Sequence, residues 1–191
     1  MGALPKTRMT VDEFLRWAQT QESGRYELVD GQVVMMSPET LRHVRVKGDA
    51  YVAFRNAIAK AGAPCTAYVD GASVRINEYE LREPDISIQC RPDDPDALVL
   101  EAPVVLVEVV SPSSSRNDTG AKVGEYFGIA TLLHYLIIDP VHRSVISHSR
   151  LEGSQKLETE IHRTGFIELN PPGLTVDVAD LLGPAPDSKT S

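Results

Sequence analysis

A glutamate interrupts an otherwise apolar run of the sequence, at a place where its carboxylate needs a partner. Glu108 lies within residues 104–110, and every other residue of that run is valine or leucine. Such a run is typical of a central strand buried on both faces. An unpaired carboxylate there costs several kcal/mol, so we expect Glu108 to coordinate a metal ion, to be protonated, or to pair with an arginine.

A second carboxylate precedes another apolar segment. Asp85 follows a proline and opens residues 86–88, which read Ile-Ser-Ile. If this strand lies beside the one that holds Glu108, the two carboxylates converge. Together with the main-chain carbonyl of Val109 they offer the hard oxygen ligands that Mg²⁺ prefers, with positions left for water and phosphate. Taken alone, Asp85 is interpreted equally well as a turn residue after proline.

A lysine further along the chain is spaced to share one helix face with two other polar residues. Asp118, Lys122 and Tyr126 recur every four residues, the spacing that brings side chains together on a helix. A lysine beside a metal site can orient the attacking water or stabilise the charge that develops during phosphoryl transfer. The simpler alternative for Lys122 is an ion pair with Asp118 on the helix surface.

Two other residues are weaker candidates for the same site. Glu27, in the segment Tyr-Glu-Leu-Val, is predicted as a third catalytic acid, although its alternation with apolar neighbours also suits a solvent-facing strand position. His43 could line the cleft as a base or lie on a helix surface. Because clustered carboxylates repel one another, at least one of Asp85 and Glu108 should have a raised pKa when the cation is absent.

The elements that must position these residues can be located first in the N-terminal half. Residues 10–13 (Thr-Val-Asp-Glu) form a capping box and predict a short helix that ends near residue 23. An Asp-Gly pair at residues 30–31 predicts a hairpin over residues 26–36. A second such pair predicts another hairpin over residues 65–76.

A long helix is predicted between these hairpins, over residues 38–62, with proline at its start and glycine at its end. Its exposed side includes basic residues that could contact phosphate, or that could simply be solvated. This basic patch comprises Arg42, Arg45 and Lys47, with Arg55 and Lys60 further on. The residues at helical spacing, expected to cover the sheet, are Leu41, Val44, Gly48, Tyr51, Val52, Ile58 and Ala61.

The C-terminal half predicts a strand, a helix and a strand in succession. These elements cover residues 104–110, 119–129 and 134–139, with residues 111–115 (Ser-Pro-Ser-Ser-Ser) breaking the first strand. Further edge strands are predicted at 145–148 and 157–161, and a short apolar end at 178–182. We therefore expect an α/β fold with a mixed, curved sheet flanked by helices, forming one domain over residues 9–182 with loose termini at 1–8 and 184–191.

Composition limits the class of protein and its compartment. The chain has 191 residues with 42% hydrophobic and 24% charged residues, close to the average for globular domains. The N-terminus lacks the apolar segment of a secretory signal, and no run is long enough to span a bilayer. Cys65 and Cys90 are expected to be reduced, buried thiols. We expect a cytoplasmic protein, and its net charge of −8 confines any nucleic-acid binding to a local patch.

In combination, these residues resemble the Uma-two family of putative restriction endonucleases, within the PD-(D/E)XK nuclease-like superfamily. The resemblance covers roughly residues 9–182, and its specificity comes from the order of several short motifs. These are residues 26–31, His43, Pro84-Asp85, residues 107–113, Asp118, Lys122, Tyr126 and residues 135–140.

The resemblance implies a restriction-endonuclease-like core and hydrolysis of phosphodiesters at a divalent-metal site. Asp85 and Glu108 would be metal ligands, with Mg²⁺ as cofactor and Mn²⁺ as substitute, and the substrate would be nucleic acid, with DNA favoured. Val110 stands where the superfamily motif has lysine, and Lys122 is the expected replacement. The alternatives are a non-catalytic binding or regulatory module and a phosphoesterase acting on small phosphates. A homodimer would suit cleavage of both strands of a duplex.

Overall fold

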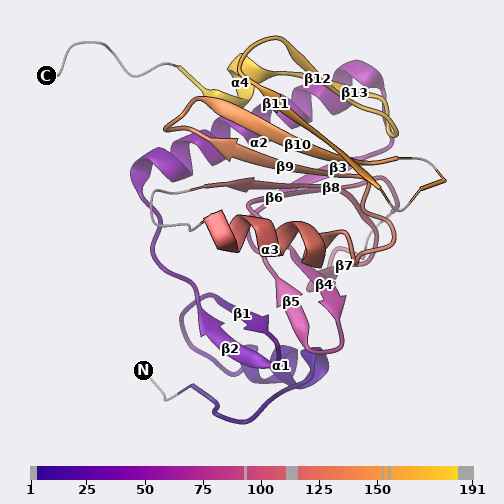
Figure 1. Ribbon diagram of the computed structural model, residues 1–191. Coiled ribbons are helices and arrows are strands. Elements are labelled where there is room, and N and C mark those ends of the chain that lie inside the picture. The colour runs from indigo at the N-terminus through magenta and orange to yellow at the C-terminus, as the bar shows by residue number, and fades with distance from the viewer. Residues whose placement is uncertain (1–3, 93, 111–115, 152, 155, 185–191) are drawn as a thin grey trace, which may run out of the picture.

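A computed structural model describes residues 4–92, 94–110, 116–151, 153–154 and 156–184, without the side chains of residues 116–119 (Figure 1). Its helices are α1 (Val11–Ala18), α2 (Leu41–Ala61), α3 (Arg116–Tyr126) and α4 (Val178–Leu182). Its strands are β1 (Tyr26–Val29), β2 (Gln32–Met35), β3 (Thr66–Val69), β4 (Ser73–Asn77), β5 (Glu80–Arg82), β6 (Ile86–Gln89), β7 (Val99–Leu100), β8 (Pro103–Val109), β9 (His134–Asp139), β10 (Ser144–Arg150), β11 (Leu157–His162), β12 (Phe166–Leu169) and β13 (Leu174–Asp177). Mixed sheets flanked by helices make this an α/β fold, as the sequence predicts.

The central layer is a six-stranded sheet in the order β11-β10-β9-β8-β6-β3. Its strands pair antiparallel except for β8 and β9, which are parallel and joined through α3. The predicted strand, helix and strand unit is therefore confirmed, although α3 begins three residues earlier than expected. Residues 111–115, predicted to break the strand, lie outside the described residues, as do the terminal residues 1–3 and 185–191.

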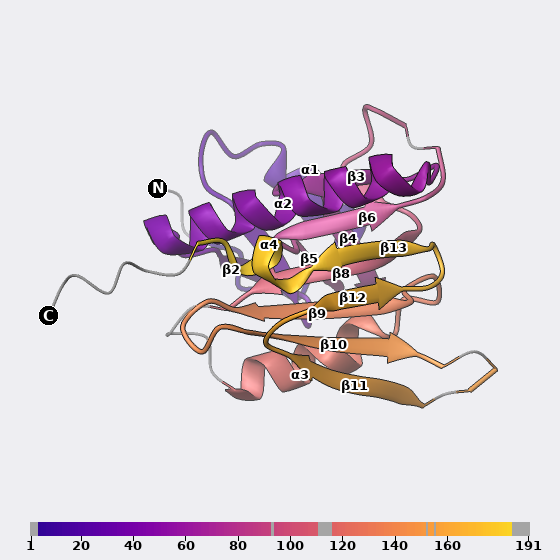
Figure 2. The same cartoon turned by 90° about the horizontal axis from the view of Figure 1, so that it is seen from above.

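Helices cover both faces of this sheet. Figure 2 shows α2 and α4 over one face, together with the β12-β13 ribbon, and α3 on the opposite face. The core beneath α2 contains the inward-facing residues of β6, β8 and β9, such as Ile86, Val107 and Leu136. The core beneath α3 contains Leu106, Tyr126 and Tyr135. Burial on both faces explains why β8 is almost continuously apolar.

A second sheet lies on the α3 side of the molecule, in the order β2-β1-β5-β4-β7 (Figure 1). Asp30 and Gly31 take positive φ angles of 47° and 75° and close the predicted β1-β2 hairpin. Thr10 and Glu13 form the predicted capping box of α1, which ends at Ala18, earlier than expected. This sheet and α1 have a small core of their own, and the strands β1 and β5 face the site described below.

The predicted hairpin over residues 65–76 is wrong. Asp70 and Gly71 do make a turn, with φ angles of 52° and 67°, but the flanking strands enter different sheets. The strand β3 pairs with β6, and β4 pairs with β5 and β7. The amide of Asp70 continues the first pairing by donating to the carbonyl of Asp85 at 3.2 Å, so the chain cannot fold back on β3.

The predicted face of α2 is right only in part, since Tyr51 and Ile58 pack against the core but three other predicted residues are exposed. Leu41, Val44 and Val52 are 86%, 49% and 55% exposed. The helix begins at Leu41 after the cap Thr40, and it packs through a face rich in small residues, which brings it close to the sheet. That face comprises Val46, Ala50, Ala53, Phe54 and Ala57. Alanine is a weak signal in a search for apolar residues at helical spacing. The expected face was therefore chosen from larger residues, some of which are exposed.

Two further expectations change. Cys65 and Cys90, expected as free thiols, form a disulfide, because they lie side by side just beyond the paired strands β3 and β6. Of the two predicted edge strands, only β11 lies at an edge, since β10 is enclosed between β9 and β11. Among the described residues, no helix is long and apolar enough to cross a membrane.

Candidate functional site

Two carboxylates face each other across neighbouring strands at one end of the six-stranded sheet. Ile86 of β6 pairs with Val107 of antiparallel β8, so the next positions outward, Asp85 and Glu108, are opposite one another. Residues directly opposite in such a pair point to the same face. The amide of Val109 donates to Asp85 Oδ2 at 2.7 Å, which holds the aspartate against the main chain beside Glu108.

Glu108 is paired through α3. Lys122 Nζ and the Tyr126 hydroxyl both donate to Glu108 Oε1, at 2.7 and 2.6 Å. Burial raises the pKa of Glu108, Lys122 acts against this, and the nearby charge of Asp85 adds to it. Burial likewise raises the pKa of Tyr126 well above its usual value. The cation that balances this carboxylate is a lysine, where the sequence analysis considered an arginine.

Asp85 has the opposite electrostatic balance. His43 Nε2 lies 3.1 Å from Asp85 Oδ1, and Lys47 Nζ lies 3.6 Å from the same oxygen. Burial alone would raise the pKa of Asp85, but His43, the Val109 amide and Lys47 together hold it below the usual value. One of the two central carboxyls thus has a raised pKa, although burial and not repulsion by Asp85 is the main cause, and the pKa of the other is lowered.

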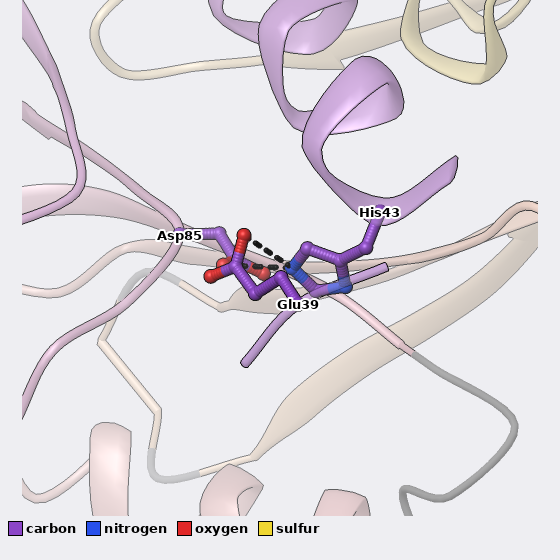
Figure 3. A group of neighbouring side chains, drawn as sticks. All are labelled: Glu39, His43 and Asp85. Carbon is purple, nitrogen blue, oxygen red and sulfur yellow. Dashed lines mark hydrogen bonds and ion pairs between the residues drawn. The ribbon is translucent and has the colours of Figure 1, made fainter. Parts of the chain in front are cut away.

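Glu39 joins this group, although the sequence analysis did not single it out. The ligand-type atoms of Glu39, His43 and Asp85 all lie within 4.8 Å of one another, and Figure 3 shows the three side chains converging from the start of α2 and the start of β6. Glu39 precedes the N-cap Thr40, and His43 is four residues further on. A carboxylate and a histidine at this spacing around a helix start are a signal that could have identified Glu39.

Lys47 is buried, so its assignment to an exposed basic patch is wrong. It is 2% exposed and donates to Glu39 Oε2 at 2.6 Å and to Asp70 Oδ1 at 2.7 Å. Arg42 and Arg45, by contrast, are exposed. The α2 helix turns Lys47 and His43, which are four residues apart, toward the same carboxylates.

Glu27 lies on the other wall of the site and does not face solvent. Its side chain is 13% exposed. Its Oε1 accepts from the Glu83 amide at 3.0 Å, and its Oε2 lies 3.4 Å from Arg82 Nη1. The charge of Glu27 also contributes to the pKa of Lys122, which is raised despite burial, mainly by Glu108. Glu27 therefore acts on the site electrostatically, from the second sheet.

Three neighbouring groups of ion pairs surround the candidate site, and together this network has an excess of acid. Around Arg82 lie Glu27, Glu80 and Glu125, and Arg25 binds Glu39, Asp70 and Glu83. Counting the pairs made by Lys47 and Lys122, eight carboxylates share four permanently positive side chains. With all carboxylates ionised, the network has four negative charges in excess. Such a cluster of charges attracts divalent cations and repels phosphate in their absence.

The fold and the sequence can be compared with known proteins. The family model Uma2, described as "Putative restriction endonuclease", matches residues 11–179. The uncharacterized protein slr1290 of Synechocystis sp. is 24% identical over 176 residues, which cover 91% of each chain.

A solved structure shares the fold. The crystal structure of a putative nuclease belonging to DUF820 from Anabaena variabilis ATCC 29413 superposes with a TM-score of 0.70 at 18% identity. The match covers 91% of this chain and 97% of the other.

Proposed function

The chain belongs to the Uma2 family of putative restriction endonucleases, and from this premise we propose that it is an endonuclease that hydrolyses nucleic-acid phosphodiesters with the help of Mg²⁺ or Mn²⁺. DNA is the proposed substrate. The observation that supports this most directly is the position of Asp85 opposite Glu108, with Lys122 hydrogen-bonded to Glu108.

The metal would be held by Asp85, Glu108 and the main-chain carbonyl of Val109. These donors are hard oxygen ligands, and the excess of negative charge in the network favours a divalent cation, so the residues fit the ion. When bound, it would supply Lewis-acid stabilisation of the phosphate and a more acidic water. A phosphodiester could then approach a group of carboxylates that otherwise repels it.

Lys122 would hold the attacking water or stabilise the charge developing on the phosphate. Its amine reaches the site from α3 and so replaces the lysine that is absent at Val110. Tyr126 fixes Glu108 by donating to the same oxygen that Lys122 contacts, and Tyr126 is itself held by an edge-on contact with Tyr135, with ring centroids 5.0 Å apart. Glu27 would act as a further acid that keeps Lys122 charged and positioned.

The proposal is tested with a cleavage assay on supercoiled DNA, single-stranded DNA and RNA. We expect no cleavage in EDTA, cleavage with Mn²⁺ or Mg²⁺, and the highest rate at low salt, because the acidic chain offers phosphate few cations. Asp85→Asn should abolish cleavage, whereas Arg75→Ala, at an exposed ion pair of the second sheet, should not.

Each negative result has a defined meaning. If Mn²⁺ stabilises the wild type and the Asp85→Asn variant abolishes this effect, yet no nucleic acid is cleaved, the site belongs to a phosphoesterase for small phosphates or to a non-catalytic module. If Mn²⁺ leaves the melting temperature unchanged, the metal-dependent function is wrong, because a ligand bound only by the folded state must stabilise it.

Location and assembly are part of the same proposal. We propose a cytoplasmic location, and a homodimer would place two sites on opposite strands of a duplex. Because cytoplasmic reductants disfavour disulfides, trapping of free thiols at Cys65 and Cys90 in freshly lysed cells tests the location. Light scattering of the purified protein tests the dimer.

A further inference from the structure

We propose that Glu39, His43 and Asp85 form a second divalent-metal position, which shares Asp85 with the first. The geometry suits an ion. His43 Nε2 lies 3.1 Å from Asp85 Oδ1 and 3.9 Å from Glu39 Oε2. Metal–ligand bonds of roughly 2.0–2.2 Å place neighbouring ligand atoms roughly 3–4 Å apart, so a cation between these atoms needs only small side-chain movements (Figure 3).

The three side chains are already ordered before any ion arrives. The exposed fractions of the Glu39, His43 and Asp85 side chains are 20%, 13% and 10%. The amide of His43 donates to the hydroxyl of the N-cap Thr40 at 3.3 Å, which fixes the first turn of α2 between Glu39 and His43. Little conformational entropy is therefore lost when these ligands bind an ion.

The charges around Glu39, His43 and Asp85 would be balanced by one divalent cation. The linked carboxylates Glu39, Asp70, Glu83 and Asp85 are matched by two permanent cations, Arg25 and Lys47. Two negative charges remain with His43 neutral, and one divalent ion neutralises them. Lys47 contacts two of the proposed ligands, Glu39 and Asp85, so both carboxylates would bind the ion and Lys47 together. Lys47 would keep its hydrogen bond to Asp70.

The imidazole gives this position a metal preference that differs from that of the first. Imidazole suits transition metals, whereas carboxylate and carbonyl oxygens suit Mg²⁺ and Mn²⁺. The histidine position should therefore favour Co²⁺ or Zn²⁺ over Mg²⁺, while its two carboxylates also allow Mn²⁺ to bind. Paired metals can stabilise both the attacking and the leaving oxygen of a phosphodiester. The inference rests on the proposed function only through the shared ligand Asp85.

The test counts bound Mn²⁺ on tag-free protein by equilibrium dialysis and detects ¹⁴N coupling to Mn²⁺ by pulsed electron paramagnetic resonance. We expect two ions per wild-type chain and ¹⁴N coupling from one imidazole. His43→Ala should bind one ion and lose the coupling, and His43→Asn should also lose it. The control His142→Ala removes an exposed histidine that contacts only one carboxylate, Asp139, and should change neither readout.

The outcomes separate this inference from the proposed function. One ion per wild-type chain, no ¹⁴N coupling, or coupling that persists in His43→Ala overturns the histidine position. Glu108→Gln probes the first position alone and should remove the other ion while leaving the coupling. If Glu108→Gln binds metal as the wild type does while His43→Ala loses one ion, the first position is wrong and the second stands. Melting in EDTA verifies that each variant is folded.

Discussion

Lys122 Nζ lies 2.7 Å from Glu108 Oε1, and the two residues belong to a strand and to the helix that follows it. The helix α3 lies over the sheet face that carries Glu108. The amine therefore reaches Glu108 from a helix and not from the strand β8. Glu108 receives its countercharge from this lysine and a second hydrogen bond from Tyr126.

Lys122→Ala should reduce cleavage by about 10²–10³-fold, the usual effect of removing one donor that stabilises a transition state. Binding of Mn²⁺ should be retained, since Lys122 is not a ligand. The measurement is turnover under saturating Mn²⁺, with dialysis for binding. Lys60→Ala, at the exposed end of α2, should behave as the wild type. Equal turnover in Lys122→Ala and wild type would remove Lys122 from the mechanism.

Arg82→Leu should destabilise the fold by about 3–5 kcal/mol, because it leaves Glu27, Glu80 and Glu125 without the positive charge that they share. Urea unfolding of the metal-free protein measures this. Arg75→Leu is the matched control on the same sheet. The Arg75 and Asp12 side chains are 41% and 65% exposed, and exposed pairs contribute about 0–1 kcal/mol. If Arg82→Leu lowers the free energy of unfolding by only about 0–1 kcal/mol, as expected for Arg75→Leu, the ion pairs of Arg82 do not stabilise the fold.

His134 should make the fold less stable as the pH falls below about 6.5, its usual pKa. Burial lowers the pKa of His134 in the folded state, so the unfolded chain binds more protons in the interval between the two values. Stability is complete above this interval and declines as the pH falls through it. His134→Gln should flatten this part of the stability curve in chemical denaturation between pH 5 and 8, relative to wild type. An unchanged slope would contradict the assignment.

Reduction of the Cys65–Cys90 bridge should lower the free energy of unfolding by about 3 kcal/mol, since it closes a loop with a sequence separation of 25. Denaturation with and without a phosphine reductant measures the change. The double variant Cys65→Ser, Cys90→Ser should have the same free energy of unfolding as the reduced wild type, and the reductant should not change it. Reductant-insensitive wild type would mean that the cysteines are not bridged in solution.

Local signals in the sequence determined several elements of this protein. The Asp-Gly pair at residues 30–31 determined the β1-β2 hairpin because few other residues accept positive φ angles in succession. The capping box at Thr10 and Glu13 determined the start of α1, since both partners lie within one turn. The apolar run around Glu108 identified a buried strand with a carboxylate that needed a counterion. These signals act over a few residues and depend little on the rest of the fold.

Only the tertiary structure decided which residues share the site with Asp85 and Glu108. The same Asp-Gly signal failed at Asp70 and Gly71, because pairing of β3 with β6 and of β4 with β5 outweighed the local preference of the turn. Glu39 and Lys47 read as ordinary polar residues near the start of a helix, and their roles arise because α2 packs its alanine-rich face on the sheet and turns them toward Asp85. A charge that is solvated in the unfolded chain becomes part of a buried network only when distant strands bring its partners together.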